Sequence, residues 1–210
     1  TTDSGADLPL SYCQTHDITV LPLAFTIEGQ TYHGSGAMDD KVFYDKLRAG
    51  ALPTTSAANP EDTAALFRTF AGQGKDLLHV AFSSGLSSTS DAAQIAAQMV
   101  MEEYPQRQVV VVDSMGAGLG TGILTCKAAD YSIADMDIRA AEEQLNIDRL
   151  GLCEYFTVDD LMFLKRTGRV SGVTAVLGSM LQIKPMLRGD EDGKIVVCGK
   201  IRGRKRAITE

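Results

Sequence analysis

Two nearly continuous apolar runs, DLLHVAFS at residues 76–83 and QVVVVDS at residues 108–114, limit the fold of this chain most strongly. Strands covered on both faces of a parallel sheet have this pattern, whereas strands with one face in water alternate apolar and polar residues. Helical patterns flank these runs, over residues 39–49, 61–71, 91–103 and 118–130. Strand and helix therefore alternate, which predicts an α/β domain with a parallel sheet.

Further elements are predicted at either side of this alternation. Residues 18–27 form a third candidate strand, and Pro22 favours an edge position for it. From about residue 150 the pattern changes to a strand, two helices at 158–167 and 171–181, and a hairpin around the DED turn at 190–192. We predict two domains, a parallel-sheet domain over 1–150 and a second α/β domain with a mixed sheet over 151–210, incomplete at its C-terminal end.

Capping residues mark several helix boundaries. Asn59 followed by Pro60 is typical of a helix start, and Ser88 with Asp91 resembles a capping box. Thr157 with Asp160 has the same spacing, and Gly168 stands where the helix over 158–167 would end.

Composition excludes several classes of protein. The sequence has no apolar run long enough to cross a bilayer and no signal-peptide pattern. The four cysteines lack CxxC spacing, which favours reduced thiols and a cytoplasmic location over a zinc site or a disulfide framework. The net charge of −7 argues against nucleic-acid binding. Five basic residues between Lys200 and Arg206 are interpreted as a solvated strand or turn, or as a docking patch.

Familiar catalytic motifs do not fit. The serine-rich turn lacks the glycines of a nucleophile elbow, and none of the three histidines has a recognisable acidic partner. The acidic pairs lack the spacing of a calcium loop, so we expect no metal site. The glycine-rich stretch at 116–122 follows a strand, but Thr121 and Ile123 stand where a dinucleotide motif needs glycine. A phosphotransferase or nucleotide-binding enzyme that uses this turn is the alternative hypothesis.

Hydroxyl side chains gather at two predicted helix entries, in AFSSGLSSTSDAA at 81–93 and PTTSAANPED at 53–62. A helix N-terminus presents free N–H groups that favour an anion, and a parallel sheet brings such turns to one edge. Neither cluster contains lysine, so we expect a carboxylate with one arginine as counter-charge. Arg169 is the candidate, although an exposed arginine at a helix end is an equally good interpretation.

Five motifs together resemble the DegV family of bacterial fatty-acid-binding proteins. They are TDSGADLP at 2–9, PTTSAANP at 53–60, SSGLSSTSDAA at 83–93, VVDSMGAGLGTG at 111–122, and the stretch LMFLKRTGRVSG to DGKI at 161–195. Residues 86–90 depart from the family pattern LSGTY, because an aromatic and a glycine are absent. Family members also begin with a short apolar strand before TDS and extend beyond the equivalent of residue 210, with a histidine near the carboxylate.

The resemblance implies a four-stranded parallel α/β/α domain, a second α/β domain with a mixed sheet, and a long-chain fatty acid in the cleft between them. It implies a carrier without enzymatic activity or cofactor, which presents the carboxylate to a separate kinase for acyl-phosphate formation in phospholipid synthesis, with room for transient contact with a membrane surface. Carried over residue by residue, it assigns the carboxylate to Thr55, Ser56, Ser84, Gly85, Ser87 and Arg169. Residues 161–164 and 173–181 are candidates for the tunnel wall, and each is also explained as ordinary core.

Overall fold

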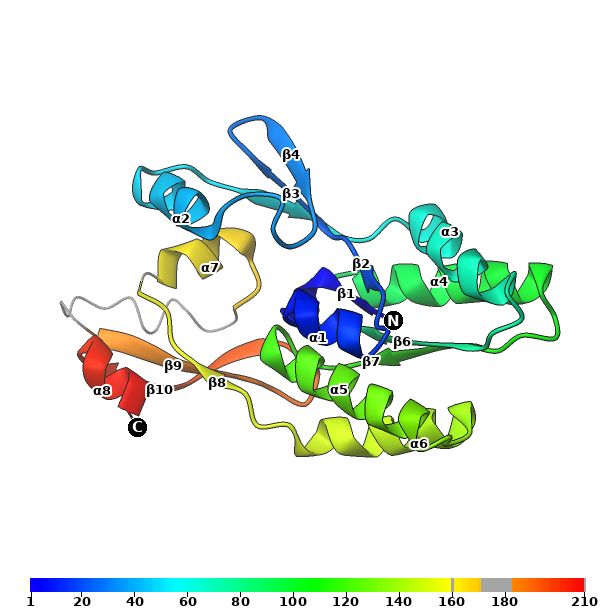
Figure 1. Cartoon of the computed structure of the whole chain (residues 1–210). Helices are drawn as coiled ribbons and strands as arrows, with labels where there is room; N and C mark the ends of the chain where they lie inside the picture. Colours follow the sequence, from blue (N-terminus) through cyan, green and yellow to red (C-terminus); the bar gives the residue numbers. More distant parts are fainter. Residues whose placement is uncertain (160, 171–182, 210) are drawn as a thin grey trace.

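A parallel sheet forms the centre of the molecule. The computed structural model describes residues 1–159, 161–170 and 183–209. The strand order is β2-β1-β6-β7, with every pair parallel, over Thr2–Asp3 (β1), Val20–Leu21 (β2), Leu77–Ala81 (β6) and Val109–Asp113 (β7) (Figure 1). The predicted four-stranded parallel sheet is therefore confirmed.

Helices cover both faces of this sheet. Successive strand residues point to opposite faces, so Val109 and Val111 pack with helices α3 (Pro60–Ala71) and α4 (Thr89–Glu103). Val110 and Val112 pack on the other face with α5 (Leu119–Ile133) and α6 (Ile138–Asp148). The continuous apolar runs of the sequence thus correspond to strands buried from both sides, as predicted. Helix α6 was not predicted.

Of two predicted helix caps, one is confirmed and the other is wrong. Asn59 caps α3 as predicted, because its Oδ1 accepts from the N–H groups of Glu61 at 2.8 Å and Asp62 at 3.3 Å. The prediction that Ser88 caps α4 with its side chain is wrong, since that side chain makes no capping hydrogen bond. The N–H of Thr89 is instead satisfied by Ser87 Oγ at 3.2 Å.

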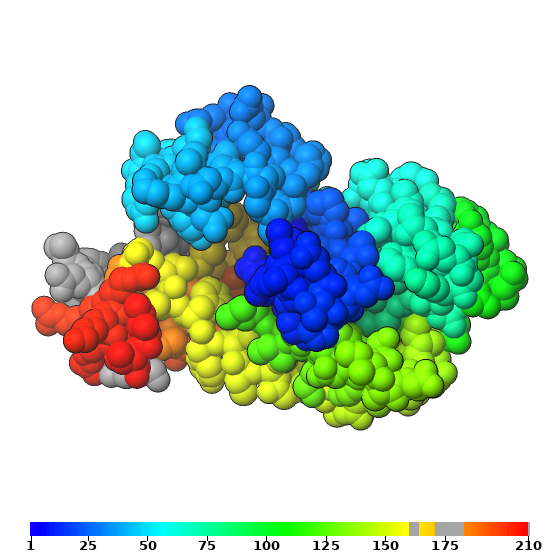
Figure 2. Space-filling model, viewed as in Figure 1, coloured from blue at the N-terminus to red at the C-terminus, as the bar shows by residue number. Residues whose placement is uncertain are grey.

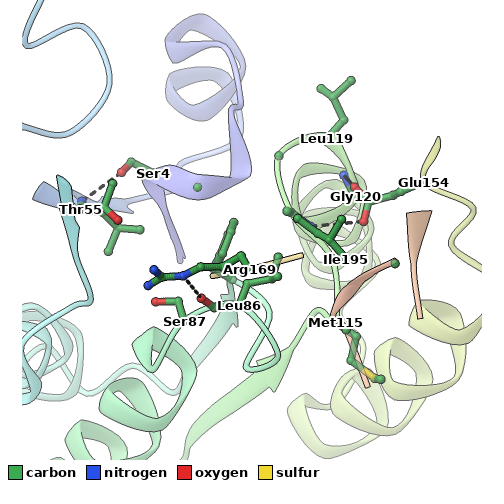
Figure 3. Close-up of a pocket in the computed structure, with 18 of the residues that line it drawn as sticks. Ser4, Thr55, Leu86, Ser87, Met115, Leu119, Gly120, Glu154, Arg169 and Ile195 are labelled. Atoms are coloured by element: carbon green, nitrogen blue, oxygen red, sulfur yellow. Dashed lines mark hydrogen bonds between the residues drawn. The ribbon is translucent and has the colours of Figure 1, made fainter. Parts of the chain in front are cut away.

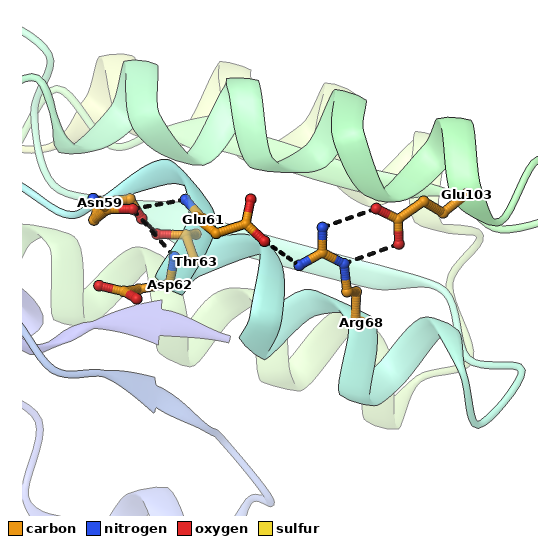
Figure 4. A network of polar contacts seen from close by, with 6 residues as sticks. All are labelled: Asn59, Glu61, Asp62, Thr63, Arg68 and Glu103. Carbon is orange, nitrogen blue, oxygen red and sulfur yellow. Dashed lines mark hydrogen bonds and ion pairs between the residues drawn. The ribbon is translucent and has the colours of Figure 1, made fainter.

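A surface ion-pair network ties α3 to α4. Arg68 donates to Glu61 on its own helix at 2.7 Å and to Glu103 on α4 at 2.8 and 2.9 Å (Figure 4). Exposed ion pairs contribute little to stability, so this network mainly orients the two helices. Burial of alanine and phenylalanine side chains between them contributes most of the packing free energy.

A second sheet interrupts the chain between β2 and α3. Its order is β4-β3-β5, all antiparallel, over Ala24–Ile27 (β3), Gln30–His33 (β4) and Thr54–Ser56 (β5), with helix α2 at Asp40–Arg48. The prediction of one strand over 18–27 is wrong, since Pro22 separates β2 from β3 and the two join different sheets. These elements form a lobe, residues 24–56, that stands clear of α3 and α4 (Figure 2).

A third sheet follows residue 150. It has the order β10-β9-β8, antiparallel, over Tyr155–Phe156 (β8), Ile183–Gly189 (β9) and Ile195–Arg202 (β10). A parallel bridge between Val170 and Ile195 adds to it, and Leu187 is buried at its centre. The predicted hairpin is confirmed, and the predicted helix over 171–181 lies outside the described residues.

Short helices complete the chain. They are a 3-10 turn at Ser4–Ala6 (η1), α1 at Leu10–Thr15, a 3-10 turn at Arg149–Gly151 (η2), α7 at Leu161–Thr167 and α8 at Arg204–Thr209. Gly168 has a φ of 71° directly after α7, as expected of a helix-ending glycine, and Asp160 of the predicted capping box lies outside the described residues. The basic run lies in β10 and α8, with Gly203 between them. Within the described part of the chain, no helix is both long and apolar enough to cross a bilayer.

Candidate functional site

A cavity of about 1080 Å³ lies where the three sheets meet. Its wall combines the lobe of residues 24–56, the turns that follow β6 and β7, and the sheet β8-β9-β10. Much of this wall is apolar, including Leu23, Phe25, Phe82, Leu119, Ile123 and Phe156. A cavity of this size and character suits a predominantly apolar ligand.

Four of the predicted carboxylate ligands line this cavity together. Thr55 and Ser56 come from β5, Ser87 from the turn before α4, and Arg169 from the segment after α7. In Figure 3 the guanidinium group of Arg169 points toward Thr55 and Ser87. Arg169, more than 80 positions away in sequence from each of the three hydroxyl residues, thus brings a positive charge to the cavity that they line.

The guanidinium group of Arg169 is held by backbone carbonyls. Its Nε donates to Leu86 O at 3.3 Å and its Nη1 to Thr167 O at 2.5 Å. Among the described residues, no carboxylate forms an ion pair with it. Since a guanidinium group has five N–H donors, it keeps capacity for an anionic ligand.

Thr89, a neighbour of Ser87, connects the two hydroxyl-rich segments. Its Oγ1 accepts from the N–H of Ala58 at 3.2 Å and lies 2.9 Å from Ser87 Oγ. The segment that follows β5 is therefore attached to the start of α4 beside the cavity. This bond and the pairing of β5 with β3 contribute to bringing the two motifs to one cavity, and neither motif indicates them alone.

Ser84 and Gly85 are placed differently from the other four residues. Neither is among the lining residues of the cavity. Ser84 is exposed and its N–H donates to Asp113 Oδ1 at 3.2 Å. Gly85 packs against the β9–β10 turn so closely that a Cβ would lie 2.4 Å from Asp192 O. Contact of these two residues with a carboxylate stays a prediction.

Ser83 accounts for another hydroxyl of the serine-rich turn. It is fully buried, and its Oγ donates to Gly193 O at 2.8 Å and accepts from Gly85 N–H at 3.2 Å. The hydroxyls therefore divide into two groups: Ser83 joins the turn to the β9–β10 hairpin, while Ser87 faces the cavity.

Asp3 shapes the wall beside the parallel sheet. Its carboxylate accepts from the N–H groups of Phe82 at 2.7 Å and Gly5 at 2.9 Å, and both of these residues line the cavity. Burial raises the pKa of Asp3 to about 6, although the two hydrogen bonds act in the opposite direction. Asp3 thus fixes the backbone of the wall rather than offering a group to a ligand.

The glycine-rich turn after β7 is filled by a side chain of the protein. Glu154 Oε2 accepts from Ala117 N–H at 3.2 Å and its Oε1 from Gly120 N–H at 3.0 Å. The N-terminal turn of α5 is where a phosphate of a nucleotide would bind. Because a carboxylate already satisfies these N–H groups, the arrangement disfavours the nucleotide-binding alternative.

The three histidines of the chain lie away from this cavity. None of His16, His33 and His79 lines the cavity. His79 is fully buried under Phe67, and burial lowers its pKa to about 3, so its imidazole is neutral. Among the described residues, no group of three or more His, Cys, Asp or Glu side chains has the arrangement of a metal site.

Sequence reasoning missed Glu154 and most of the apolar wall. Leu164 lines the cavity, whereas residues 173–181, the other predicted wall segment, lie outside the described residues. Glu154 had a usable signal, because it is the one charge in the apolar run LGLCEYF at 150–156. Phe25 gave no comparable signal, since its contribution depends on the lobe folding over the cavity.

Comparisons with known proteins agree on one family. The family model described as "Uncharacterised protein, DegV family" matches residues 1–210. The DegV domain-containing protein SPs1668 of Streptococcus pyogenes serotype M3 is 38% identical over 211 residues, which cover 100% of this chain and 74% of that protein.

Two solved structures show the same fold. A DegV family protein from Thermus thermophilus, described in terms of fatty acid binding, has a TM-score of 0.85 and 34% identity over 98% of this chain and 72% of its own. A fatty-acid (stearic acid)-binding protein from Eubacterium ventriosum has a TM-score of 0.87 and 26% identity over 99% of this chain and 72% of its own.

Proposed function

The chain belongs to the DegV family, and from its cavity we propose that it binds a long-chain fatty acid, with the carboxylate at Thr55, Ser56, Ser87 and Arg169. The observation that carries the proposal is that these four residues line one mainly apolar cavity, in which Thr55, Ser87 and Arg169 lie on the same side (Figure 3). Contact of Ser84 and Gly85 with the carboxylate, which the family resemblance also implies, is part of the same proposal, although neither is among the residues that line the cavity.

The head group needs these polar partners. An ionised carboxylate removed from water without hydrogen bonds or a counter-charge is strongly disfavoured. Arg169 supplies the positive charge, and the hydroxyls of Thr55 and Ser87 supply further donors. Donors without any lysine favour a single carboxylate over a phosphate, which carries more charge and more acceptor oxygens.

The alkyl chain supplies most of the affinity. Burying roughly fifteen methylenes at about 0.8 kcal/mol each contributes about 12 kcal/mol before the cost of ordering the ligand. Phe25, Leu119, Ile123 and Phe156 give the cavity an apolar surface against which such a chain packs. Solved relatives described as binding fatty acids support this assignment.

We further propose that the protein is a carrier and not an enzyme. None of the described residues that line the cavity is a histidine, which supports this part of the proposal. In this role it presents the carboxylate to a separate kinase, which forms the acyl phosphate used in phospholipid synthesis. The proposal places the protein in the cytoplasm, with transient contact with a membrane surface during exchange of the fatty acid and with no cofactor of its own.

Lipid extraction tests the proposal directly. The purified full-length protein should release about one fatty acid per chain on extraction, identified by mass spectrometry. Titration of delipidated protein with hexadecanoic acid should then restore full occupancy. A preparation that contains no lipid and does not bind added hexadecanoic acid contradicts the proposal, and calorimetry with ATP tests the nucleotide alternative on the same sample.

A further inference from the structure

The glycine-rich turn at 116–122 is built around the carboxylate of Glu154. A Cβ at Gly120 would lie 2.2 Å from Glu154 Cδ, and a Cβ at Gly116 would lie 2.7 Å from Glu154 Oε2. Any side chain at either position would displace the carboxylate. The motif that resembles a nucleotide-binding turn therefore makes room for an acidic side chain of the same protein.

This carboxylate takes the place of an anionic ligand at α5. It accepts from the N–H of Gly120, in the first turn of a helix of fifteen residues, and from the N–H of Ala117, just before that helix. The positive end of the helix dipole favours a negative charge at this position. With Glu154 in place, these N–H groups are satisfied and an alkyl chain can lie beside them without leaving donors unpaired.

Glu154 and the predicted head-group site lie apart within one cavity. Figure 3 shows Thr55, Ser87 and Arg169 on one side, and Glu154 with Gly120 on the other. Leu119 and Ile123, on the same helix turn as Gly120, add apolar surface to the side that holds Glu154. The side with Arg169 thus attracts an anionic group, whereas the side with Glu154 already contains a carboxylate.

We propose that Glu154 is a specificity-determining residue, which fixes the direction of the bound acid and excludes acids with a second carboxylate at the far end. This inference rests on the proposed function. A carboxylate directed toward Glu154 meets a like charge and finds the N–H groups of Ala117 and Gly120 occupied. A methyl end meets apolar side chains, so only one orientation of a monocarboxylic acid is favourable.

Paired titrations test this role. Affinity is measured for hexadecanoic acid and for α,ω-dicarboxylic acids of twelve to eighteen carbons, with wild-type protein and with Glu154→Ala. The wild type should prefer the monocarboxylic acid strongly. In Glu154→Ala the freed N–H groups can donate to the second carboxylate, and the preference for hexadecanoic acid over the best-fitting dicarboxylic acid should fall by at least about tenfold.

Two further variants make the test decisive. Glu154→Gln keeps the size of the side chain but removes its charge. It should reduce the preference for hexadecanoic acid over the dicarboxylic acids, and it keeps the test possible if Glu154→Ala does not fold. Glu143→Ala removes an exposed acidic residue of α6 that does not line the cavity, and it should leave the preference unchanged. If the wild type binds hexadecanoic acid and neither Glu154 variant narrows the preference, the inference is overturned. If the wild type binds no hexadecanoic acid, the proposed function itself fails.

Discussion

The hydroxyl of Ser83 donates to the carbonyl of Gly193 at 2.8 Å, across 110 residues of sequence. This bond holds the β9–β10 hairpin against the turn after β6, and both segments contribute to the cavity wall. The close approach depends on glycine, because a Cβ at Gly193 would lie 2.2 Å from Ser83 Oγ.

Gly193→Ala should therefore destabilise the protein through two effects. The φ of 70° strains any residue with a Cβ, and the added methyl displaces the Ser83 hydroxyl. Gly29→Ala is a matched control, because Gly29 has a φ of 79° with no atom within 4 Å of a Cβ. We expect a loss of about 1 kcal/mol for Gly29→Ala and of about 3 kcal/mol for Gly193→Ala in urea denaturation. Equal losses would contradict the close packing at Ser83.

Arg169→Ala and Ser87→Ala should discriminate between an acid and its ester. Both side chains are proposed to contact the carboxylate, so each variant should lose more affinity for hexadecanoic acid than for its methyl ester. The loss for the acid should be roughly tenfold to a hundredfold for Arg169→Ala and smaller for Ser87→Ala. Arg48→Ala, on the exposed face of α2, serves as the control for a change in net charge. Equal losses for acid and ester would place these residues outside the head-group site.

Leu119→Ser, unlike Arg169→Ala and Ser87→Ala, should weaken binding of the acid and of the ester equally. Leu119 is 73% exposed in the first turn of α5 and lines the cavity, so its apolar surface is available to a ligand. Affinity for acid and ester should fall alike, by up to about tenfold, because the side chain contacts the alkyl chain alone. Thermal unfolding of the unliganded protein should be nearly unchanged. A change limited to the acid would mean that the chain lies elsewhere.

The stability of the α5–α6 pair should depend on pH through Asp148. Hydrogen bonds from Tyr131 at 2.5 Å and Gln144 at 3.1 Å, together with Lys127 at 3.0 Å, hold the pKa of Asp148 below its ordinary value. A lowered pKa in the folded state stabilises the protein above the unfolded pKa of about 3.8, and this contribution is lost as pH falls.

Asp148→Asn should accordingly cost about 1 kcal/mol at pH 7 in urea denaturation, and the difference from wild type should shrink below about pH 4. Glu143→Gln, an exposed change on the same helix, should show no such pH dependence. A difference that persists undiminished at pH 3 would show that Asp148 acts through packing and not through its charge.

Charge reversal at Arg202 and Arg204 should separate kinase coupling from lipid binding. Both residues are exposed, at the end of β10 and the start of α8, on the basic segment for which a docking role is one of the two interpretations. The doubly reversed protein should retain its affinity for hexadecanoic acid while kinase-dependent acyl-phosphate formation falls, because an acidic partner surface is repelled. Unchanged coupling would remove the docking role. Since Arg204 also pairs with Asp159 at 2.8 Å, Arg202→Glu alone serves as the cleaner single variant.

The parallel sheet could be predicted because its information is local. Val109 to Val112 are apolar on both faces, and Asn59 satisfies the start of α3 within three residues. β5 gave no such signal, since Thr54–Ser56 is short, polar and exposed and becomes a strand only by pairing with β3. Strand β1 was hidden for a similar reason, because two residues are too few for a periodicity.

The sequence indicated which kind of group the candidate site would bind better than it indicated where each side chain lies. Hydroxyl clusters and Arg169 indicated a carboxylate, and four of the six named residues do line one cavity. Which serine faces inward depends on contacts far away in sequence, as the bond from Ser83 to Gly193 shows. Glu154 stands out as the one charge in an apolar run, but its role could not be predicted because its partners are backbone N–H groups of a distant turn.

The lobe of residues 24–56 covers part of the cavity and is joined to the rest of the protein by two short segments. One is fastened by the N–H of Leu23, which donates to Ser4 Oγ at 3.0 Å, and the other by the N–H of Ala58, which donates to Thr89 Oγ1 at 3.2 Å. Each fastening is a single neutral hydrogen bond, with a net strength of about 1 kcal/mol. Because β3, β4 and β5 form a sheet of their own, we expect the lobe to move outward as one unit, which would open the cavity to the proposed ligand while its three strands stay paired.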